Sequence, residues 1–156
     1  MPPAREAFVI VDSAYVNLIG RLLLGLMFLA SGINKIADPA GTQHYMTLMG
    51  MTWMTTLFYL GAVAIELAGS LSLILGYRTR AGGWLLFLFM VPTTLIFHTN
   101  FADPNQFIHF LKNLSVMGGL LYAAQYGASR FSMDAGLERA ERADVPPRPL
   151  KRVVHQ

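Results

Sequence analysis

The stretch TTLFYLGAVAIELAGSLSLILGYRTR, from Thr55 to Arg80, decides the fold. It opens with some 20 apolar or small residues, about the length that crosses the hydrocarbon core of a bilayer as a helix. It closes with a Gly-Tyr turn signal and two arginines, Arg78 and Arg80. One carboxylate, Glu66, lies near the middle, where an acidic side chain costs roughly 2.5–3.5 kcal/mol on membrane-insertion scales. We therefore expect Glu66 to have a partner on another helix, or to face a watery cavity.

The composition indicates a single-domain integral membrane protein. Hydrophobic residues make up 54% of the 156 residues and charged residues only 13%, against roughly 25% charged in soluble domains. The absence of cysteine excludes disulfides, thiol relays and cysteine-ligated metals, and we expect no metal site. The net charge of +3 is typical of basic cytoplasmic loops. Nucleic-acid binding is not expected, because the basic residues are not interleaved with aromatic residues on a polar face.

The predicted fold class is all-α: an integral membrane four-helix bundle with spans at about residues 15–36, 56–75, 83–98 and 108–126. The bundle occupies residues 14–127, after a short segment at residues 1–13 and before a basic tail at residues 128–156. We expect one short helix in the tail, at about residues 134–143. The first span is too long for a signal peptide, so we expect it to be retained.

Two further features concern the ends of the spans. Residues 42–54 are too few to cross a membrane and indicate an interfacial or re-entrant helix over the outer mouth, or an ordered loop. Arginines cluster before the first span, between the second and third, and after the fourth, whereas the two other loops contain neither Lys nor Arg. The positive-inside rule then places both termini in the cytoplasm of a bacterial inner-membrane protein.

Several ionisable residues lie inside the predicted spans. Counting 1.5 Å per helical residue places Arg21 in the inner half, below Glu66. It gathers five polar residues in the outer half: Lys35, His98, His109, Lys112 and Asn113. Arg21 and Lys35 are fourteen residues apart, so they project from the same side of their helix.

Two interpretations of these residues stay open. In the first, Glu66 forms a structural ion pair with Lys112 or Arg21 that holds the bundle in register, and Lys35 extends from the end of its span to the interface. In the second, Glu66 and the five outer residues line a ligand-binding pocket under residues 42–54, with Glu66 and His98 as candidate catalytic groups for proton transfer. The first predicts that Glu66 is hard to replace unless its partner is replaced as well.

The chain resembles the DoxX family of small four-helix bacterial membrane proteins over roughly Leu18 to Asp134. The resemblance lies in Arg21, Gly25, Phe28, Gly32 and Lys35, in Glu66 with the following LAGSLSLILGYRTR, and in PTTLIFH, KNLSVMGGLLYAA and GASRFSMD. It implies that the recurring polar positions of the family are Arg21, Lys35, Glu66, His98, Lys112 and Asn113.

The family is named after a subunit of an archaeal thiosulfate:quinone oxidoreductase, which shapes the expected function. The resemblance implies a redox-associated subunit that binds a quinone or similar amphiphile, carries no cofactor of its own, and depends on a larger partner protein for electrons. The chain is at most oxidoreductase-associated. The alternatives are a non-enzymatic scaffold or assembly factor and, ranked third, a small-solute or proton pathway. A homo-oligomer in the bilayer is compatible with each of them.

Overall fold

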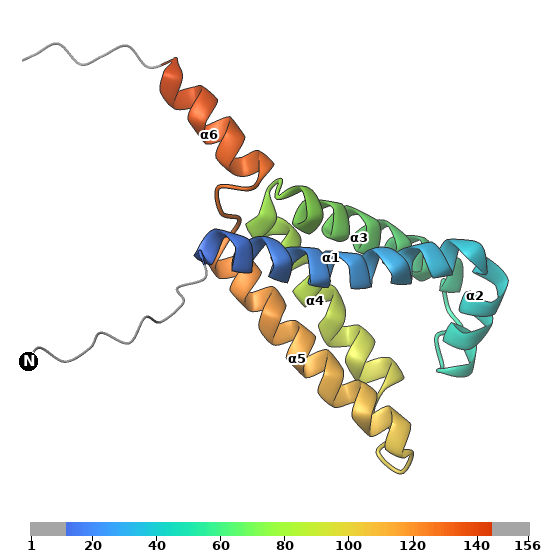
Figure 1. Cartoon of the computed structure of the whole chain (residues 1–156). Helices are drawn as coiled ribbons and strands as arrows, with labels where there is room; N and C mark the ends of the chain where they lie inside the picture. The colour runs from blue at the N-terminus through green and yellow to red at the C-terminus, as the bar shows by residue number, and fades with distance from the viewer. Residues whose placement is uncertain (1–11, 145–156) are drawn as a thin grey trace, which may run out of the picture.

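A computed structural model describes residues 12–144, and all six of its regular elements are helices (Figure 1). They are α1 (Ser13–Ala37), α2 (Pro39–Leu48), α3 (Thr55–Leu75), α4 (Thr79–Phe97), α5 (Pro104–Tyr126) and α6 (Met133–Ala143). The predicted all-α class is therefore confirmed for the described part of the chain, and α6 confirms the short helix in the tail. The predictions for most of residues 1–13 and for the tail beyond residue 144 lie outside the described residues.

Three helices, α1, α3 and α4, are long and apolar enough to cross a membrane. They match the first three predicted spans. Helix α5 has 23 residues, about 35 Å at 1.5 Å per residue. Its first turns carry His109, Lys112 and Asn113, and it is not among the three. A fourth span on α5 therefore stays a prediction.

Helices α4 and α5 begin earlier than predicted. The prediction treated Asp103-Pro104 as part of a loop, yet the Asp103 side chain accepts a hydrogen bond from the Asn105 amide (2.9 Å) and Pro104 starts the helix. Asp at the N-cap followed by Pro at the first helical position is a strong helix start. Helix α4 begins at Thr79 rather than at residue 83, because a side chain from a distant segment caps it, as described below.

Helix α2 overlaps the segment predicted as an interfacial helix or an ordered loop, residues 42–54. The helix starts earlier and ends earlier than predicted, and residues 49–54 are not helical. Asp38 accounts for its start: this residue ends α1, and its side chain accepts a hydrogen bond from the Gly41 amide (2.9 Å). Tyr45 of α2 stacks on Phe97 at the end of α4, with 5.7 Å between the ring centroids. Helix α2 therefore links the ends of α1 and α4.

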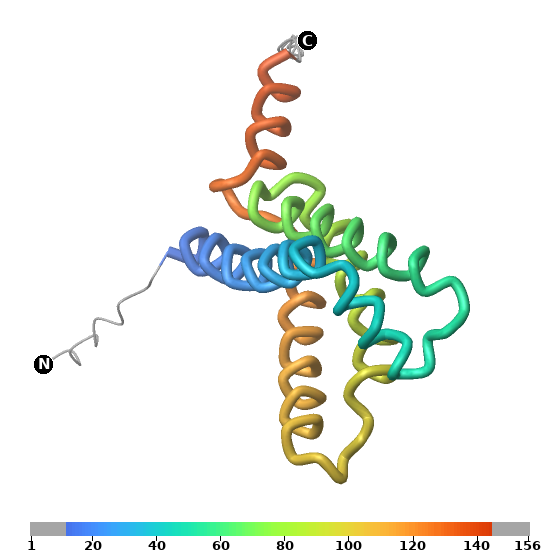
Figure 2. The backbone as a smooth tube through the Cα atoms, turned by 90° about the vertical axis from the view of Figure 1, so that its right-hand side faces the viewer, coloured from blue at the N-terminus to red at the C-terminus, as the bar shows by residue number. Residues whose placement is uncertain are grey.

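The four long helices form two arms. Helix α1 packs mainly on α3, and helix α4 packs mainly on α5. The contact between α1 and α5 is small. The arms meet beside the α3–α4 turn, here called the joined end, and diverge toward α2, here called the open end (Figures 1 and 2). The buried core lies where they meet and draws on all four helices: Phe28, Leu73, Leu86, Met90, Leu120 and Ala123.

Gly83 sets how closely α4 and α5 approach within the second arm. A Cβ at this position would lie 2.8 Å from the Ala124 nitrogen and 3.1 Å from the Leu120 carbonyl oxygen. Both are backbone atoms of α5, so a methyl group can be accommodated only if the two helices move apart.

We predict that Gly83→Ala destabilises the protein by about 1–3 kcal/mol, the usual cost of overpacking. The measurement is thermal unfolding of the purified chain in detergent, followed by circular dichroism. Gly118→Ala is the matched control, because a Cβ at Gly118 of α5 would meet nothing within 4 Å. It should leave stability unchanged or raise it, since alanine is the better helix former. Equal stability of the two variants would contradict this packing.

Candidate functional site

Arg21 and Lys35, which were predicted to project from the same side of their helix, lie on one face of α1. The face runs through Arg21, Gly25, Phe28, Gly32 and Lys35, at spacings of three and four residues. The first four of these residues are buried, and the Lys35 side chain is 25% exposed. Both cations contact α3, so the predicted common side is confirmed.

The partner of Glu66 is Lys35. The Lys35 Nζ lies 2.9 Å from each Glu66 carboxylate oxygen, and the Ser31 hydroxyl donates a third hydrogen bond, to Oε1 (3.1 Å). Lys35 also donates to the Ser31 Oγ (2.8 Å), while the Tyr59 hydroxyl donates to the Lys35 carbonyl (3.1 Å). Glu66 is only 4% exposed. The site is therefore a buried, hydrogen-bonded ion pair between α1 and α3.

The prediction that Lys112 or Arg21 pairs with Glu66 is wrong. The prediction estimated depth in the membrane from the positions of Cα atoms alone. The long side chain of Lys35 reaches back along α1 toward the middle of the helix, and this estimate did not include it. Lys35 does not extend outward from its span, as a terminal lysine in lipid often does. Lys112 is exposed on α5, in the other arm. Gly32 brings α1 close to α3, since a Cβ there would lie 3.0 Å from the Leu67 side chain.

Arg21 is bound at the joined end instead. It is 2% exposed and donates to the Leu73 carbonyl (3.2 Å), the Phe131 carbonyl (2.7 Å) and the Asn17 Oδ1 (3.1 Å). Leu73 lies in the last turn of α3, where the helix dipole favours a cation. The Asp134 carboxylate adds attraction through space. Arg21 thus ties α1 to α3 and to the segment that follows α5.

Sequence reasoning missed two residues of this end, Asn17 and Asp134. Asn17 donates to the Gly127 carbonyl (3.0 Å) and accepts from the Ser129 amide (3.0 Å). Asp134 accepts from the Arg78 amide (2.7 Å), the Thr79 amide (3.1 Å) and the Thr79 hydroxyl (3.0 Å). It therefore caps α4 from 55 residues away. In the sequence, Asp134 looks only like a residue in the first turn of its own helix, so no local pattern indicates this contact.

The polar residues of the α4–α5 arm form two small groups near the open end. The His98 Nδ1 lies 2.8 Å from the Gln106 Oε1, and the His98 and His109 ring centroids are 5.3 Å apart. The Asn113 amide donates to the Thr94 hydroxyl (3.0 Å) across the α4–α5 contact. The predicted polar residues are thus divided between the arms: Lys35 and Glu66 on one, and His98, His109, Lys112 and Asn113 on the other.

A pocket of about 280 Å³ lies at the open end, between the end of α2 and the α4–α5 connection. Its walls are Met49, Ile96, Phe97, Thr99, Asn100, Asp103 and Gln106. Gln106 connects the pocket to His98 through the hydrogen bond described above. Within residues 12–144, no group of three or more His, Asp or Glu side chains is placed to hold a metal ion.

Comparison with known proteins identifies a family and two relatives. The sequence profile of the DoxX family matches residues 16–99. The chain is 35% identical over 123 residues to inner membrane protein YqjF of Escherichia coli K12, and the aligned region covers 78% of this chain and 92% of YqjF. It is 31% identical over 122 residues to inner membrane protein YphA of the same organism, and the aligned region covers 75% of this chain and 86% of YphA. No solved structure gave a significant match.

The ion pair leads to a prediction about stability. We expect Glu66→Leu to lower the free energy of unfolding by about 3–5 kcal/mol, because it leaves the Lys35 ammonium without its carboxylate. Lys35→Met combined with Glu66→Leu should recover most of this loss, since replacing both charges with apolar groups is often neutral. Arg130→Met, which breaks the exposed pair with Asp12, is the control and should cost less than about 1 kcal/mol. Thermal unfolding in detergent measures the stability of these three variants. If Lys112→Met combined with Glu66→Leu recovered as much stability as the Lys35→Met double variant, the pairing of Lys35 with Glu66 would be contradicted.

The cap on α4 leads to a second prediction. We expect Asp134→Ala to destabilise the protein by about 1–2 kcal/mol, the upper range for loss of a helix cap, because Thr79 is fully buried and its amide loses its acceptor. Glu141→Ala, on the same helix, should stay near the wild-type value. Hydrogen exchange by mass spectrometry should show faster exchange in the first turn of α4 in Asp134→Ala alone. Unchanged exchange in that turn would show that Asp134 is not its cap.

Proposed function

The chain belongs to the DoxX family, and on that premise we propose that it is an inner-membrane protein that binds the headgroup of a quinone or similar amphiphile at its open end. In this proposal α1, α3, α4 and α5 all cross the membrane, and α2 lies at the interface over the outer mouth. The named relatives YqjF and YphA are inner membrane proteins, which supports this location.

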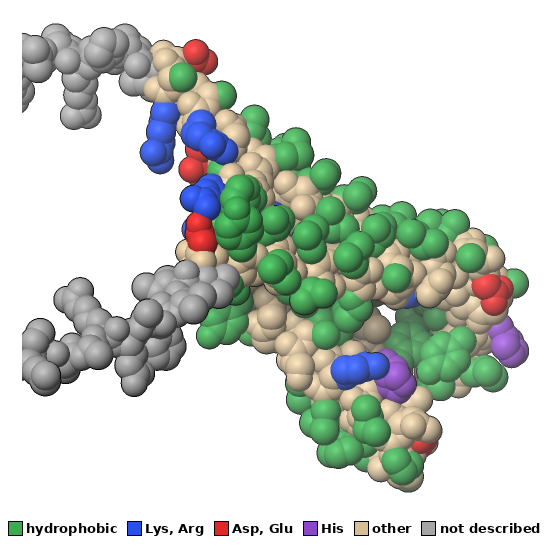
Figure 3. Space-filling model, in the orientation of Figure 1, with side chains coloured by type: hydrophobic (Ala, Val, Ile, Leu, Met, Phe, Trp, Pro, Cys, Tyr) green, Lys and Arg blue, Asp and Glu red, His purple; other side chains and the backbone are tan. Residues whose placement is uncertain are grey.

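The distribution of charge supports an orientation with the joined end in the cytoplasm. The described arginines other than Arg21 all lie at or beyond that end: Arg78, Arg80, Arg130, Arg139 and Arg142. In the space-filling view, charged side chains gather at the joined end and α6, while hydrophobic side chains cover the arms (Figure 3). Basic loops stay in the cytoplasm during insertion, so both termini would lie there.

The observation that carries the proposal is the composition of the open-end pocket. Met49, Ile96 and Phe97 supply apolar walls, and Thr99, Asn100 and Gln106 supply hydrogen-bonding groups. An apolar slot with a few polar groups is the usual form of a site for an amphiphilic ring. Its volume of about 280 Å³ suits a headgroup whose tail continues into the membrane. The contact between Tyr45 and Phe97 supports the proposal that α2 covers the pocket.

The structure changes which residues the proposal assigns to proton handling. Glu66 is paired with Lys35 in the other arm, so we assign it a structural role. His98 lies beside the pocket through Gln106 and faces His109, so this histidine pair is the candidate route for protons to or from a bound headgroup. In this proposal the chain carries no electron carrier of its own, and a partner protein would supply the electrons for a redox reaction.

A scaffold or assembly factor is the second candidate. In the described part of the chain, no buried side-chain nitrogen or oxygen lacks a hydrogen-bond partner. An interior whose buried polar atoms all have hydrogen-bond partners suits a protein that serves as a rigid scaffold. Helix α6 has no buried residue and projects from the joined end (Figure 1). This leaves its surface available to a partner.

Binding of a fluorescent quinone analogue to the full chain in lipid nanodiscs separates the two candidates. We expect Gln106→Leu and Phe97→Ala each to weaken binding about tenfold, which corresponds to about 1.4 kcal/mol. Ser115→Ala is the control, because Ser115 is exposed on α5 outside the pocket, and it should bind as the wild type does. Unchanged binding by both pocket variants would refute the site. Absence of binding by the wild type, together with a stable cross-linked membrane partner, would favour the scaffold.

A further inference from the structure

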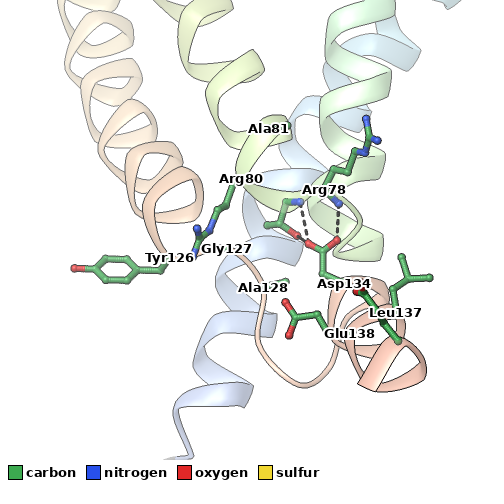
Figure 4. A pocket seen from close by; sticks show the side chains of 11 residues that line it. Arg78, Arg80, Ala81, Tyr126, Gly127, Ala128, Asp134, Leu137 and Glu138 are labelled. Atoms are coloured by element: carbon green, nitrogen blue, oxygen red, sulfur yellow. Dashed lines mark hydrogen bonds between the residues drawn. The ribbon is translucent and has the colours of Figure 1, made fainter. Parts of the chain in front are cut away.

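A second pocket, of about 550 Å³, lies at the joined end, far along the bundle from the first. It is bounded by the start of α4, the end of α5 and one face of α6 (Figure 4). Arg80 of α4 extends along the end of α5, where a Cβ on Gly127 would lie 3.2 Å from the Arg80 Cγ. Leu137 and Glu138 of α6 form the opposite wall. Nothing in the proposed quinone site uses these residues.

The two walls carry opposite charges that are not joined. Arg80 lies on the α4 wall, and Glu138 and Glu141 lie on the α6 wall. No ion pair links them in residues 12–144, where the pairs formed are Lys35–Glu66 and Asp12–Arg130. Arg78 also lines the pocket, and its guanidinium lies over the Tyr77 ring, 5.9 Å from the centroid. Asp134 also lines the pocket, but its carboxylate is engaged in capping α4 (Figure 4). The pocket is therefore wide enough to keep a cation and two carboxylates apart.

Aromatic residues mark the depth of this pocket in a bilayer. Tyr126 lines it and is 67% exposed. It stacks on Tyr122, with 5.7 Å between the ring centroids. Exposed tyrosines at the end of a membrane helix lie at the level of the lipid headgroups. If α5 crosses the membrane as proposed, a lipid headgroup lies at the level of this pocket and can enter between α4, α5 and α6.

We propose that this pocket binds the zwitterionic headgroup of phosphatidylethanolamine. Arg80 holds the phosphate, since guanidinium groups form strong charge-assisted hydrogen bonds with phosphate. Glu138 and Glu141 hold the primary ammonium, which has three protons to donate. Leu137 and Tyr126 contact the glycerol and the upper part of the acyl chains. A purely anionic headgroup would meet two carboxylates, and the quaternary ammonium of a choline headgroup has no proton to donate, so both should bind more weakly.

Native mass spectrometry of the full chain released from mixed nanodiscs tests this site. With phosphatidylethanolamine and phosphatidylglycerol in equal amounts, we expect the wild type to retain the ethanolamine lipid preferentially. Arg80→Gln should lower retention of both lipids about tenfold, the loss expected for one charge-assisted hydrogen bond. Glu138→Gln should lower retention of the ethanolamine lipid only. These two variants therefore distinguish recognition of the phosphate from recognition of the ammonium.

Arg142→Gln is the matched control. It removes a cation from α6 outside the pocket lining, and it should leave both lipids at wild-type levels. Equal retention of the two lipids by the wild type would overturn the proposal, and so would a loss in Arg142→Gln as large as in Arg80→Gln. If α6 instead closes its glutamates directly onto Arg80, Glu138→Gln would increase retention of both lipids, which would also overturn it. Neither result depends on the quinone-binding test, because the two pockets share no residue.

Discussion

A charge placed inside an apolar helix pair must be neutralised by the protein itself, and the contact between Lys35 and Glu66 meets this requirement. Glu66 accepts two hydrogen bonds from Lys35 and one from Ser31. Because Lys35 and Ser31 both belong to α1, the pair fixes the rotation of α1 and its register against α3. The rest of the first arm follows from this register, including the contact of Gly32 with Leu67.

The two ends of the bundle differ in how their polar groups are satisfied. At the joined end, Arg21, Asn17 and Asp134 bind backbone groups of α3, of α4 and of the segment after α5, so the helix ends are held together. At the open end, the polar contacts of α4 and α5 stay within their own arm, and the Thr56 hydroxyl of α3 donates to the Gln43 side chain of α2 (2.8 Å). The Tyr45–Phe97 stack connects α2 to the end of α4. Breaking an aromatic stack costs less than breaking a network of buried hydrogen bonds to a charge. This difference favours the open end as the site of the proposed quinone headgroup, because the helices separate more easily there.

The sequence predicted the helices well and the tertiary contacts poorly. Runs of apolar residues located α1, α3 and α4, and the spacing of Arg21 and Lys35 correctly placed both on one face. Depth counted along the helices could not identify the partner of Glu66, because a lysine side chain reaches across more than one turn. The division into two arms was missed since it depends on which helices pack, and hydropathy does not encode this. The cap from Asp134 was missed because it joins residues far apart in the chain.

The distance between the Lys35 and Glu66 side chains is the most direct test of this account. Solid-state NMR of the full chain in lipid bilayers, with isotope-labelled lysine and glutamate, measures the dipolar coupling between the Lys35 Nζ and the Glu66 carboxyl carbon. The account predicts a strong coupling in the wild type, because the Nζ lies 2.9 Å from each carboxylate oxygen, and it predicts that the coupling is lost in Lys35→Met and kept in Lys112→Met. A wild type without this coupling, or a coupling that Lys112→Met removes, would contradict the claim that Lys35 is the partner of Glu66.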